Sequence, residues 1–239
     1  MINGIVFDLD DTLYEQRAPF ADAITALFPT FPINKLSSLF LQFRHFSDLH
    51  YMKTIRGEWT LEKMRYERIR LALQAEDFYA EDKDLSKFQA MYNQALERIT
   101  LPKEIQQILD FLTTQNIPIG IITNGPVERQ TNKINALQLK NWFAPNTIMI
   151  SDGVKIQKPD PKIFKLMEEH LGLSEDTLLY IGDSFENDVI GAKSANWNVW
   201  WFNHQHRPLP DNQSILFDQE ITSFEALKQA VLTEKNLQR

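Results

Sequence analysis

The sequence predicts an α/β fold in which a doubly wound, mostly parallel sheet is interrupted by an all-helical insertion. Two observations support this fold class. Short and almost uninterrupted apolar runs recur along the chain, which is typical of strands covered on both faces. Helical patterns separate most of these runs, and such alternation indicates parallel strand pairing. The predicted strands are residues 4–9, 117–123, 147–150, 178–181 and 199–202.

Helices are predicted between these strands from the spacing of apolar residues. One apolar helical face runs over residues 105–112, and a second helix is predicted over 163–171. Gly172 is expected to end the second helix, because glycine readily adopts the left-handed conformation that closes many helices. The tail is predicted to end in a helix over residues 223–232.

Residues 17–100 interrupt the alternation of strands and helices. This stretch contains no convincing strand, and apolar residues such as Phe88, Tyr92 and Ile99 follow helical spacing. We therefore predict an α/β core formed by residues 1–16 and 101–239, with residues 17–100 inserted as a helical domain.

The composition excludes several classes of protein. A net charge of −7 is unsuited to a general nucleic-acid surface, which needs clustered lysine and arginine. The absence of cysteine excludes disulfides, thiolate catalysis and cysteine-based zinc sites. The N-terminus does not resemble a signal peptide, and no run approaches the ~20 apolar residues of a membrane helix. We expect a cytoplasmic monomer or homodimer that acts on a small molecule, without nucleic-acid or membrane partners.

In the segment GIVFDLDDTLY, residues 4–14, the apolar run of a predicted strand is followed closely by three aspartates, Asp8, Asp10 and Asp11. Asp8 and Asp10 lie two residues apart on extended chain, so both can face one site at the carboxyl end of the strand. Neighbouring carboxylates raise each other's pKa unless a cation intervenes, and Mg²⁺ is the commonest such cation with oxygen ligands. Asp11 is expected to be a turn or capping residue. Capping suits Asp8 poorly, because a carboxylate directly after Phe7 is costly to desolvate without a partner.

A second acidic cluster follows another predicted strand, in the segment LLYIGDSFENDVIGA. Asp183 can join Asp8 on the cation if the two strands lie close together in the sheet. Asp188 fits a first helical turn, from which it can support the site. Gly182 allows the backbone to turn tightly near a ligand. Each cluster alone is explained by capping, but two clusters at strand ends favour a shared metal site.

Two further segments supply candidate phosphate ligands. Thr123 and Asn124 end another predicted strand, where a hydroxyl group and backbone N–H groups can hold phosphate oxygens. A plain turn is the alternative, since Asn-Gly pairs are common in turns. Lys158 precedes Pro159, which disfavours helix there and holds the lysine on a stiff segment. A solvated surface position is the alternative for Lys158, but we favour a functional role.

Together, these motifs resemble the haloacid dehalogenase superfamily. The matching residues occur in the family's order at strand ends: Asp8-x-Asp10-x-Thr12, Thr123 with Asn124, Lys158, and Gly182-Asp183 with Asp188. The resemblance covers residues 1–16 and 101–239, and it implies a Rossmann-like core. The helical insertion is similar to the helical caps of this family, which are expected to close over the site and choose the substrate.

The resemblance also implies a role for each matching residue. Asp8 would be the nucleophile that forms an aspartyl-phosphate, and Asp10 would be the general acid and base. Mg²⁺ would be held by Asp8, the backbone carbonyl group of Asp10, Asp183 and, in support, Asp188. The phosphoryl group would be bound by Thr123, Asn124 and Lys158. The implied activity is magnesium-dependent hydrolysis of a small phosphate ester.

Alternatives from other classes stay open. A 2-haloacid dehalogenase releases halide without a general acid or magnesium, so the presence of Asp10 and Asp183 favours a phosphatase. A non-catalytic phosphate-binding regulatory module would be expected to have lost a catalytic acid. The substrate is also open, with a nucleoside monophosphate, flavin mononucleotide, a sugar phosphate and phosphoglycolate as candidates. Substrate contact is undecided for Trp59, Arg65, Tyr66, Arg68, His204 and His206.

Overall fold

The computed structural model describes residues 1–210, 216–234 and 237, and these residues form two compact units. The α/β unit consists of Met1–Glu15 and Thr100–Arg239, and the helical unit consists of Gln16–Ile99. Each unit buries its own set of apolar side chains, so each is described separately below.

The described residues of the α/β unit form a six-stranded parallel sheet with the strand order β3-β2-β1-β4-β5-β6. The strands are β1 (Gly4–Phe7), β2 (Ile119–Thr123), β3 (Ile148–Ile150), β4 (Leu178–Gly182), β5 (Asn198–Phe202) and β6 (Gln219–Ile221). The chain runs outward from β1 to β3, and then returns to add β4 to β6 on the other side of β1. The strand order therefore reverses between β1 and β4, which is where ligands bind in sheets of this type.

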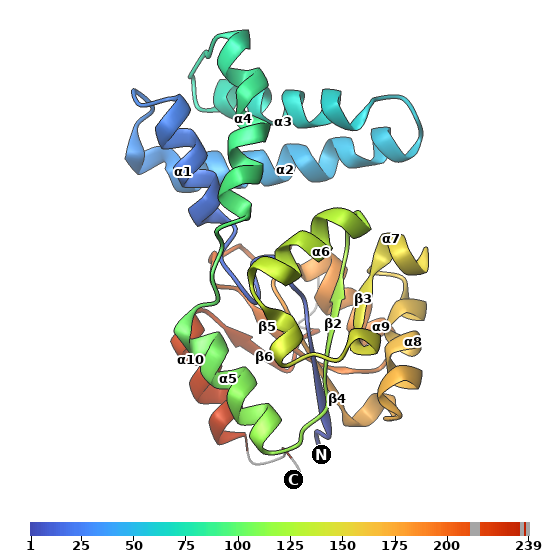
Figure 1. Cartoon of the computed structure of the whole chain (residues 1–239). Coiled ribbons are helices and arrows are strands. Elements are labelled where there is room, and N and C mark those ends of the chain that lie inside the picture. Colours follow the sequence, from blue (N-terminus) through green and yellow to red (C-terminus); the bar gives the residue numbers. More distant parts are fainter. Residues whose placement is uncertain (211–215, 235–236, 238–239) are drawn as a thin grey trace. The chain divides into compact units, whose positions relative to one another are not determined.

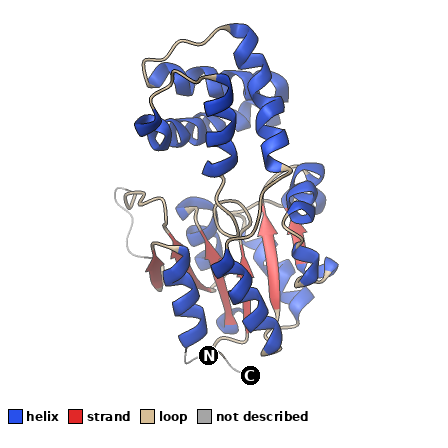
Figure 2. Cartoon of the chain, turned by 60° about the vertical axis from the view of Figure 1, so that its left-hand side comes forward, coloured by secondary structure: helices blue, strands red, loops and turns tan. Residues whose placement is uncertain are grey.

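Helices cover both faces of this sheet (Figures 1 and 2). They are α5 (Lys103–Thr114), α6 (Val127–Ala136), α7 (Ser151–Val154), α8 (Pro161–Leu171), α9 (Gly191–Ser194) and α10 (Phe224–Thr233). Shorter helical turns are η2 (Leu139–Asn141), η3 (Pro145–Thr147), η4 (Glu175–Thr177) and η5 (Phe185–Ile190). Every residue of β1, β2 and β4 is buried, as expected for strands that are covered on both faces.

Local sequence explains the bounds of α8. Pro161 stands at the first helical position, where its missing N–H group leaves no donor unsatisfied. The Asp160 side chain caps the start of the helix by accepting a hydrogen bond from the Lys162 backbone, with 3.0 Å between the atoms. Gly172 ends the helix in the left-handed conformation with φ of 66°, which confirms the predicted C-cap.

All five predicted strands are present. Strands β1, β2 and β3 are shorter than predicted, and β4 and β5 are each one residue longer. Strand β6 is absent from the predicted strands, because Gln219–Ile221 is short and mostly polar. This composition suits its place at the edge of the sheet, where one side of the strand is unpaired. The predicted helices over 105–112, 163–171 and 223–232 correspond to α5, α8 and α10.

The helical unit contains α1 (Arg17–Leu27), η1 (Ile33–Lys35), α2 (Leu36–Ile55), α3 (Leu61–Ala75) and α4 (Asp82–Leu96). Aromatic side chains from α1, α2 and α4 meet in its core. The Phe20 ring centre lies 4.8 Å from that of Phe43 and 5.7 Å from that of Phe88. These contacts join helices that are distant in sequence, so the insertion has a core of its own. In the described part of the chain, no helix is both long and apolar enough to cross a lipid bilayer.

Candidate functional site

The carboxyl ends of β1, β2 and β4 lie at one edge of the sheet, around the point where the strand order reverses. Asp8 directly follows β1, Asp183 directly follows β4, and Thr123 is the last residue of β2. The backbone N–H group of Asp8 donates to the carbonyl oxygen of Ile181 over 2.9 Å, so β1 and β4 stay paired up to the site. Parallel pairing thus brings together motifs that lie far apart in the sequence.

Asp8, Asp183 and Asp188 form the carboxylate cluster of this site. One oxygen atom from each lies within 4.8 Å of the others, and all three residues are buried. Burying one carboxylate without a cation is unfavourable, and burying three together is more so. Buried oxygen donors at this spacing suit a hard divalent cation such as Mg²⁺, and this donor set fits the metal that the sequence predicts.

Asp188 reaches the cluster from η5, the helical segment that follows β4. The Ser184 hydroxyl group caps this segment by accepting from the Asn187 backbone N–H over 3.2 Å. The Ser184 backbone N–H donates to Oδ2 of Asp188 over 2.9 Å, which fixes one oxygen of the carboxylate. A Cβ atom at Gly182 would overlap the Asp188 side chain, so glycine is required here by this close approach.

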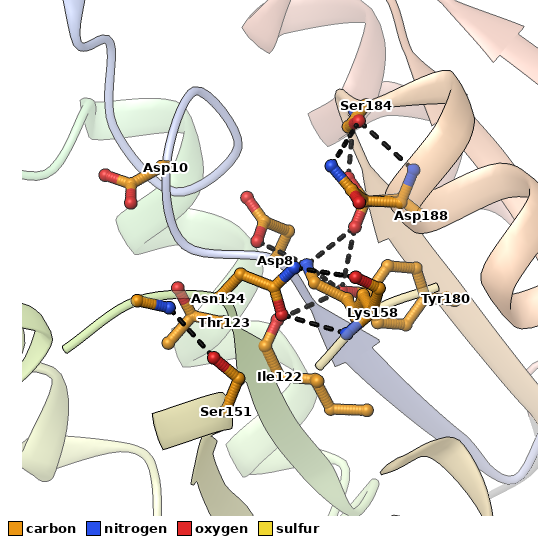
Figure 3. A network of polar contacts seen from close by, with 12 residues as sticks. Asp8, Asp10, Ile122, Thr123, Asn124, Ser151, Lys158, Tyr180, Ser184 and Asp188 are labelled. Carbon is orange, nitrogen blue, oxygen red and sulfur yellow. Dashed lines mark hydrogen bonds and ion pairs between the residues drawn. The ribbon is translucent and has the colours of Figure 1, made fainter. Parts of the chain in front are cut away.

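Lys158 supplies a buried positive charge to the carboxylate cluster. Its Nζ atom lies 2.6 Å from Oδ1 of Asp8 and 2.6 Å from Oδ1 of Asp188. The same atom donates to the Tyr180 hydroxyl oxygen over 2.8 Å, and Figure 3 shows these side chains converging on it. The Tyr180 hydroxyl group in turn donates to the carbonyl oxygen of Ile122 over 3.0 Å. Lys158 therefore lies in the site, and the surface alternative for this residue is wrong.

The Asn124 side chain holds the backbone of Lys158. Its Nδ2 atom donates to the Lys158 carbonyl oxygen and its Oδ1 atom accepts from the Lys158 N–H, each over 2.9 Å. The neighbouring Thr123 is buried, and its hydroxyl oxygen accepts a hydrogen bond from Nε2 of Gln130. Because that oxygen already accepts, the Thr123 hydroxyl proton is available for a ligand. Phosphate binding by Thr123, Asn124 and Lys158 stays a prediction.

The Asp10 carboxylate is held apart from the carboxylate cluster, as Figure 3 shows. Its two oxygens lie 2.6 and 2.7 Å from Nζ of Lys133, which is buried on α6. Gln130 donates to Oδ2 of Asp10 over 3.0 Å, and the Tyr14 hydroxyl group donates to Oδ1 over 2.5 Å. Burial alone would raise the pKa of Asp10, but the Lys133 ammonium and these hydrogen bonds lower it below the ordinary value.

The ionised forms of two carboxyl groups in the cluster, those of Asp8 and Asp183, are destabilised. Burial raises the pKa of Asp8 to about 7, although the Lys158 ammonium group opposes this, and Asp188 adds to the rise. Burial also raises the pKa of Asp183 well above its ordinary value, although Arg207 opposes this shift. Burial alone would lower the pKa of Lys158, but the carboxylates of Asp188 and Asp8 raise it. A dication bound to these oxygens would lower the pKa values of Asp8 and Asp183, which favours the anionic form of Asp8.

The remaining predicted positions around the α/β site have other contacts. Asp11 is a buried turn residue with φ of 58°, in agreement with the turn prediction, since aspartate tolerates this conformation. Nε2 of His204 lies 2.9 Å from the Asp11 carbonyl oxygen, and the His204 ring stacks on Phe202. His206 is exposed. Among the described residues, neither histidine belongs to the carboxylate cluster.

Candidate substrate residues in the helical unit have contacts within that unit. Arg68 is buried, donates to Ser47 over 3.1 Å and to Gln89 over 2.6 Å, and lies over the Phe43 ring. The Tyr66 hydroxyl group donates to Asp82 over 2.6 Å. Trp59 lies against the ammonium groups of Lys53 and Lys63, and Arg65 lies on α3. Arg68 and Tyr66 thus have roles inside this unit, whereas substrate contact by any of the four residues is untested.

Several residues that contact the predicted site residues are not among the matching motif residues. Gln130 and Lys133 lie three residues apart and so share one face of α6. Gln130 and Lys133 are a polar pair on the buried face of a helix that begins soon after Asn124, and this pattern could have indicated that they lie at the site. Tyr180 is hidden in an apolar strand, and Arg207 lies 3.0 Å from Oδ2 of Asp183 with no motif to mark it.

Comparison with known proteins places this chain among hydrolases. A family model described as haloacid dehalogenase-like hydrolase matches residues 5–202. Pyrimidine 5'-nucleotidase YjjG of Escherichia coli (strain K12) is 34% identical over 97 residues, which are 40% of this chain and 42% of that protein. This chain therefore aligns with less than half of YjjG.

Two further comparisons span more of the chain. Phosphoglycolate phosphatase of Shigella sonnei (strain Ss046) is 27% identical over 202 residues, covering 81% of this chain and 78% of that protein. The structure of L-2-haloacid dehalogenase from Xanthobacter autotrophicus superposes with a TM-score of 0.72 at 19% identity, covering 98% of this chain and all of that chain. The second likeness shows a common fold and carries no information on the reaction.

Proposed function

The chain belongs to the haloacid dehalogenase-like hydrolase family, and we propose that it is a magnesium-dependent phosphomonoesterase that acts on a small phosphorylated metabolite. The family assignment makes the chain a hydrolase. The choice of a phosphate ester and of magnesium rests on the chemistry of the site. The names of the curated relatives, a nucleotidase and a phosphoglycolate phosphatase, agree with this choice.

The carboxylate cluster is the observation that supports this proposal most strongly. Asp8, Asp183 and Asp188 are buried with an oxygen of each within 4.8 Å of the others. A site with this much negative charge repels an anionic substrate unless cations outweigh it. A dication together with the Lys158 ammonium group reverses the sign of the site, so that a phosphate group is attracted to it.

The residues divide the proposed reaction between them. An Asp8 carboxylate oxygen attacks phosphorus, the bond from phosphorus to the ester oxygen breaks, and Asp8 carries the phosphoryl group as an acyl phosphate. Lys158 and the Thr123 hydroxyl group bind the phosphoryl oxygens, with the backbone at Asn124. Asp8, Asp183 and the Asp10 carbonyl oxygen would hold Mg²⁺, with Asp188 in support, and the ion would supply charge neutralisation of the phosphoryl oxygens.

Asp10 is the proposed proton carrier of this reaction. Once it leaves Lys133, Asp10 takes up a proton, and its carboxyl group gives that proton to the departing alkoxide. Its carboxylate then removes a proton from the water that hydrolyses the acyl phosphate. Both Asp10 oxygens are bound to Lys133 in this structure, at 2.6 and 2.7 Å. In the proposed reaction the Asp10 side chain exchanges these contacts for the leaving group.

We assign substrate selection to the helical unit, Gln16–Ile99, acting as a cap. An inserted unit with its own core can change its surface without disturbing the α/β unit, which suits a role in selectivity. Nucleoside monophosphates and phosphoglycolate are the first substrates to test, because the curated relatives are named for such compounds.

The proposal is tested with the purified protein and p-nitrophenyl phosphate, before and after treatment with EDTA. Hydrolysis is expected to stop when metal is removed and to return when Mg²⁺ is added. Full activity in excess EDTA would contradict the proposal. A panel of phosphorylated metabolites then identifies the substrate class, and chloride release from 2-chloropropionate without any phosphoester turnover would favour a dehalogenase.

A further inference from the structure

Arg207 pairs with a residue of the carboxylate cluster and has no part in the reaction proposed above. Its Nη2 atom lies 3.0 Å from Oδ2 of Asp183. The Asp183 side chain is 5% exposed and the Arg207 side chain is 27% exposed, so one partner is buried and the other lies at the boundary with solvent. An ion pair between such partners is less screened than a pair on the open surface.

The backbone of Arg207 is fixed in place by Asn203, a buried residue just after β5. Oδ1 of Asn203 accepts from the Arg207 N–H over 2.8 Å, and Nδ2 of Asn203 donates to the Arg207 carbonyl oxygen over 2.9 Å. The same Nδ2 atom donates to Glu220 on β6 over 2.7 Å. These hydrogen bonds close the loop formed by residues 203–207 and fix the Arg207 backbone beside the site.

Asp183 is equally constrained on its side of the pair. Nε1 of Trp201 donates to the Asp183 carbonyl oxygen over 2.9 Å, which ties the start of the loop after β4 to β5. The backbone of each partner is therefore fixed, and the Asp183 side chain is buried. The ion pair is accordingly less screened by solvent than a pair on the open surface.

The formal charges of the site identify what this ion pair does. Among the described residues, the three carboxylates of the cluster contact two cationic side chains, Lys158 and Arg207. When all three carboxyl groups are ionised, the metal-free site thus lacks one positive charge. With a dication bound, positive charge exceeds negative charge by one, so the second cation is no longer needed. Lys158 is enclosed between Asp8 and Asp188, which makes Arg207 the cation that can withdraw.

We propose that Arg207 is a tethered counter-cation that competes with the divalent metal ion for Asp183. This inference rests on the proposed function, since it requires that the cluster binds a metal. While the metal is absent, Arg207 offsets the repulsion among the carboxylates and stabilises the fold. When the metal binds, the guanidinium group gives up the Asp183 oxygen and retains its loop contacts with Asn203. Arg207 therefore lowers metal affinity and stabilises the metal-free protein.

Calorimetric titration of the EDTA-treated and dialysed protein with MgCl₂ tests this inference. Arg207→Met removes the positive charge and is expected to tighten Mg²⁺ binding by about three- to tenfold. This is the effect expected for loss of an ion pair whose strength lies between those of an exposed pair and a buried pair. The metal-free variant should also melt at a lower temperature than the native protein. Arg207→Lys is the matched control, because it keeps the charge and should bind Mg²⁺ nearly as the native protein does.

The outcomes separate this inference from the proposed function. Arg207→Gln removes the charge but keeps a hydrogen-bond donor, so it replaces Arg207→Met if circular dichroism shows that the methionine variant does not fold. Unchanged or weaker Mg²⁺ binding in the folded charge-removing variant, with normal binding by the native protein, would overturn the role of Arg207 alone. A native protein that binds no Mg²⁺ would overturn the proposed function and this inference together.

Discussion

The Nζ atom of Lys158 lies 2.6 Å from Oδ1 of Asp8, although the two residues are 150 positions apart in the sequence. The fold creates this contact by pairing the strands around β1 and by clamping the Lys158 backbone to Asn124. The residue proposed as nucleophile is thereby held beside a permanent positive charge that also contacts Asp188.

Replacing Lys158 by methionine should damage both stability and activity. The change leaves the buried carboxylates of Asp8 and Asp188 without their shared ammonium group. Breaking a buried ion pair on one side destabilises proteins by about 3–5 kcal/mol, and we expect a loss of this size in urea unfolding at neutral pH. Loss of a cation that stabilises the transferring phosphoryl group should reduce turnover about 10²- to 10³-fold.

Lys155→Met is the matched control for this change. Lys155 lies three residues away, and its ammonium group pairs with Asp152 on the surface, where its side chain is 77% exposed. The control variant should behave like the native protein within about 0.5 kcal/mol of unfolding free energy. If the Lys158 variant matched the control in stability and turnover, the buried ion pairs would have no function.

Metal-free protein should become less stable relative to Asp8→Asn as the pH rises. The pKa of Asp8 is about 7 in the folded protein, against an ordinary value of 3.8. Because the folded-state pKa is raised, the stability contributed by Asp8 is fully present below the unfolded pKa and is lost as the pH rises through about 7. Burial raises the pKa of Asp183 as well, which acts in the same direction.

Melting temperatures in EDTA at about pH 5 and about pH 8 measure this effect. The native protein should lose stability relative to Asp8→Asn between these two values, because asparagine cannot ionise. A difference between the two proteins that stays constant across this interval would show that Asp8 has an ordinary pKa in the fold. Added Mg²⁺ should remove most of the difference, since the ion favours the ionised carboxylate.

Asp10→Asn should affect substrates according to their leaving groups. An alkyl phosphate releases a basic alkoxide that needs a proton, and loss of a general acid reduces such a step by about 10²- to 10⁴-fold. p-Nitrophenolate leaves without protonation, so its release in the first turnover should change little. Rapid-mixing measurements of the first turnover isolate this step from the later hydrolysis, in which Asp10 also acts. Equal losses for both substrates would exclude a general-acid role.

Much of the fold is predictable from the sequence because its signals are local. The continuous burial of β1, β2 and β4 comes from runs of adjacent apolar residues, which can be read without any knowledge of the sheet. The end of α8 follows from the conformational freedom of Gly172 alone. Strand β6 carries no such local signal, because its stability comes from pairing with β5 and from its place at the sheet edge.

The site is predictable where its residues follow strands, and it is unpredictable where contacts depend on tertiary packing. Asp8 and Asp183 are identified by their positions at strand ends, and the strand order brings them together. The contact of Lys133 with Asp10 depends on how α6 packs against the loop after β1, which no spacing rule specifies. The pairing of Arg207 with Asp183 likewise depends on a loop closed by the Asn203 side chain.

The most direct measurement is acid quenching of the magnesium-loaded protein during turnover, followed by mass spectrometry of its peptides. The peptide that contains Asp8 should carry the mass of one phosphoryl group. That mass should be absent from EDTA-treated protein and from Asp8→Asn. An active protein whose Asp8 peptide never gains a phosphoryl group, or gains it equally without a divalent ion, would contradict the proposal that metal-assisted transfer to Asp8 is the chemistry of this site.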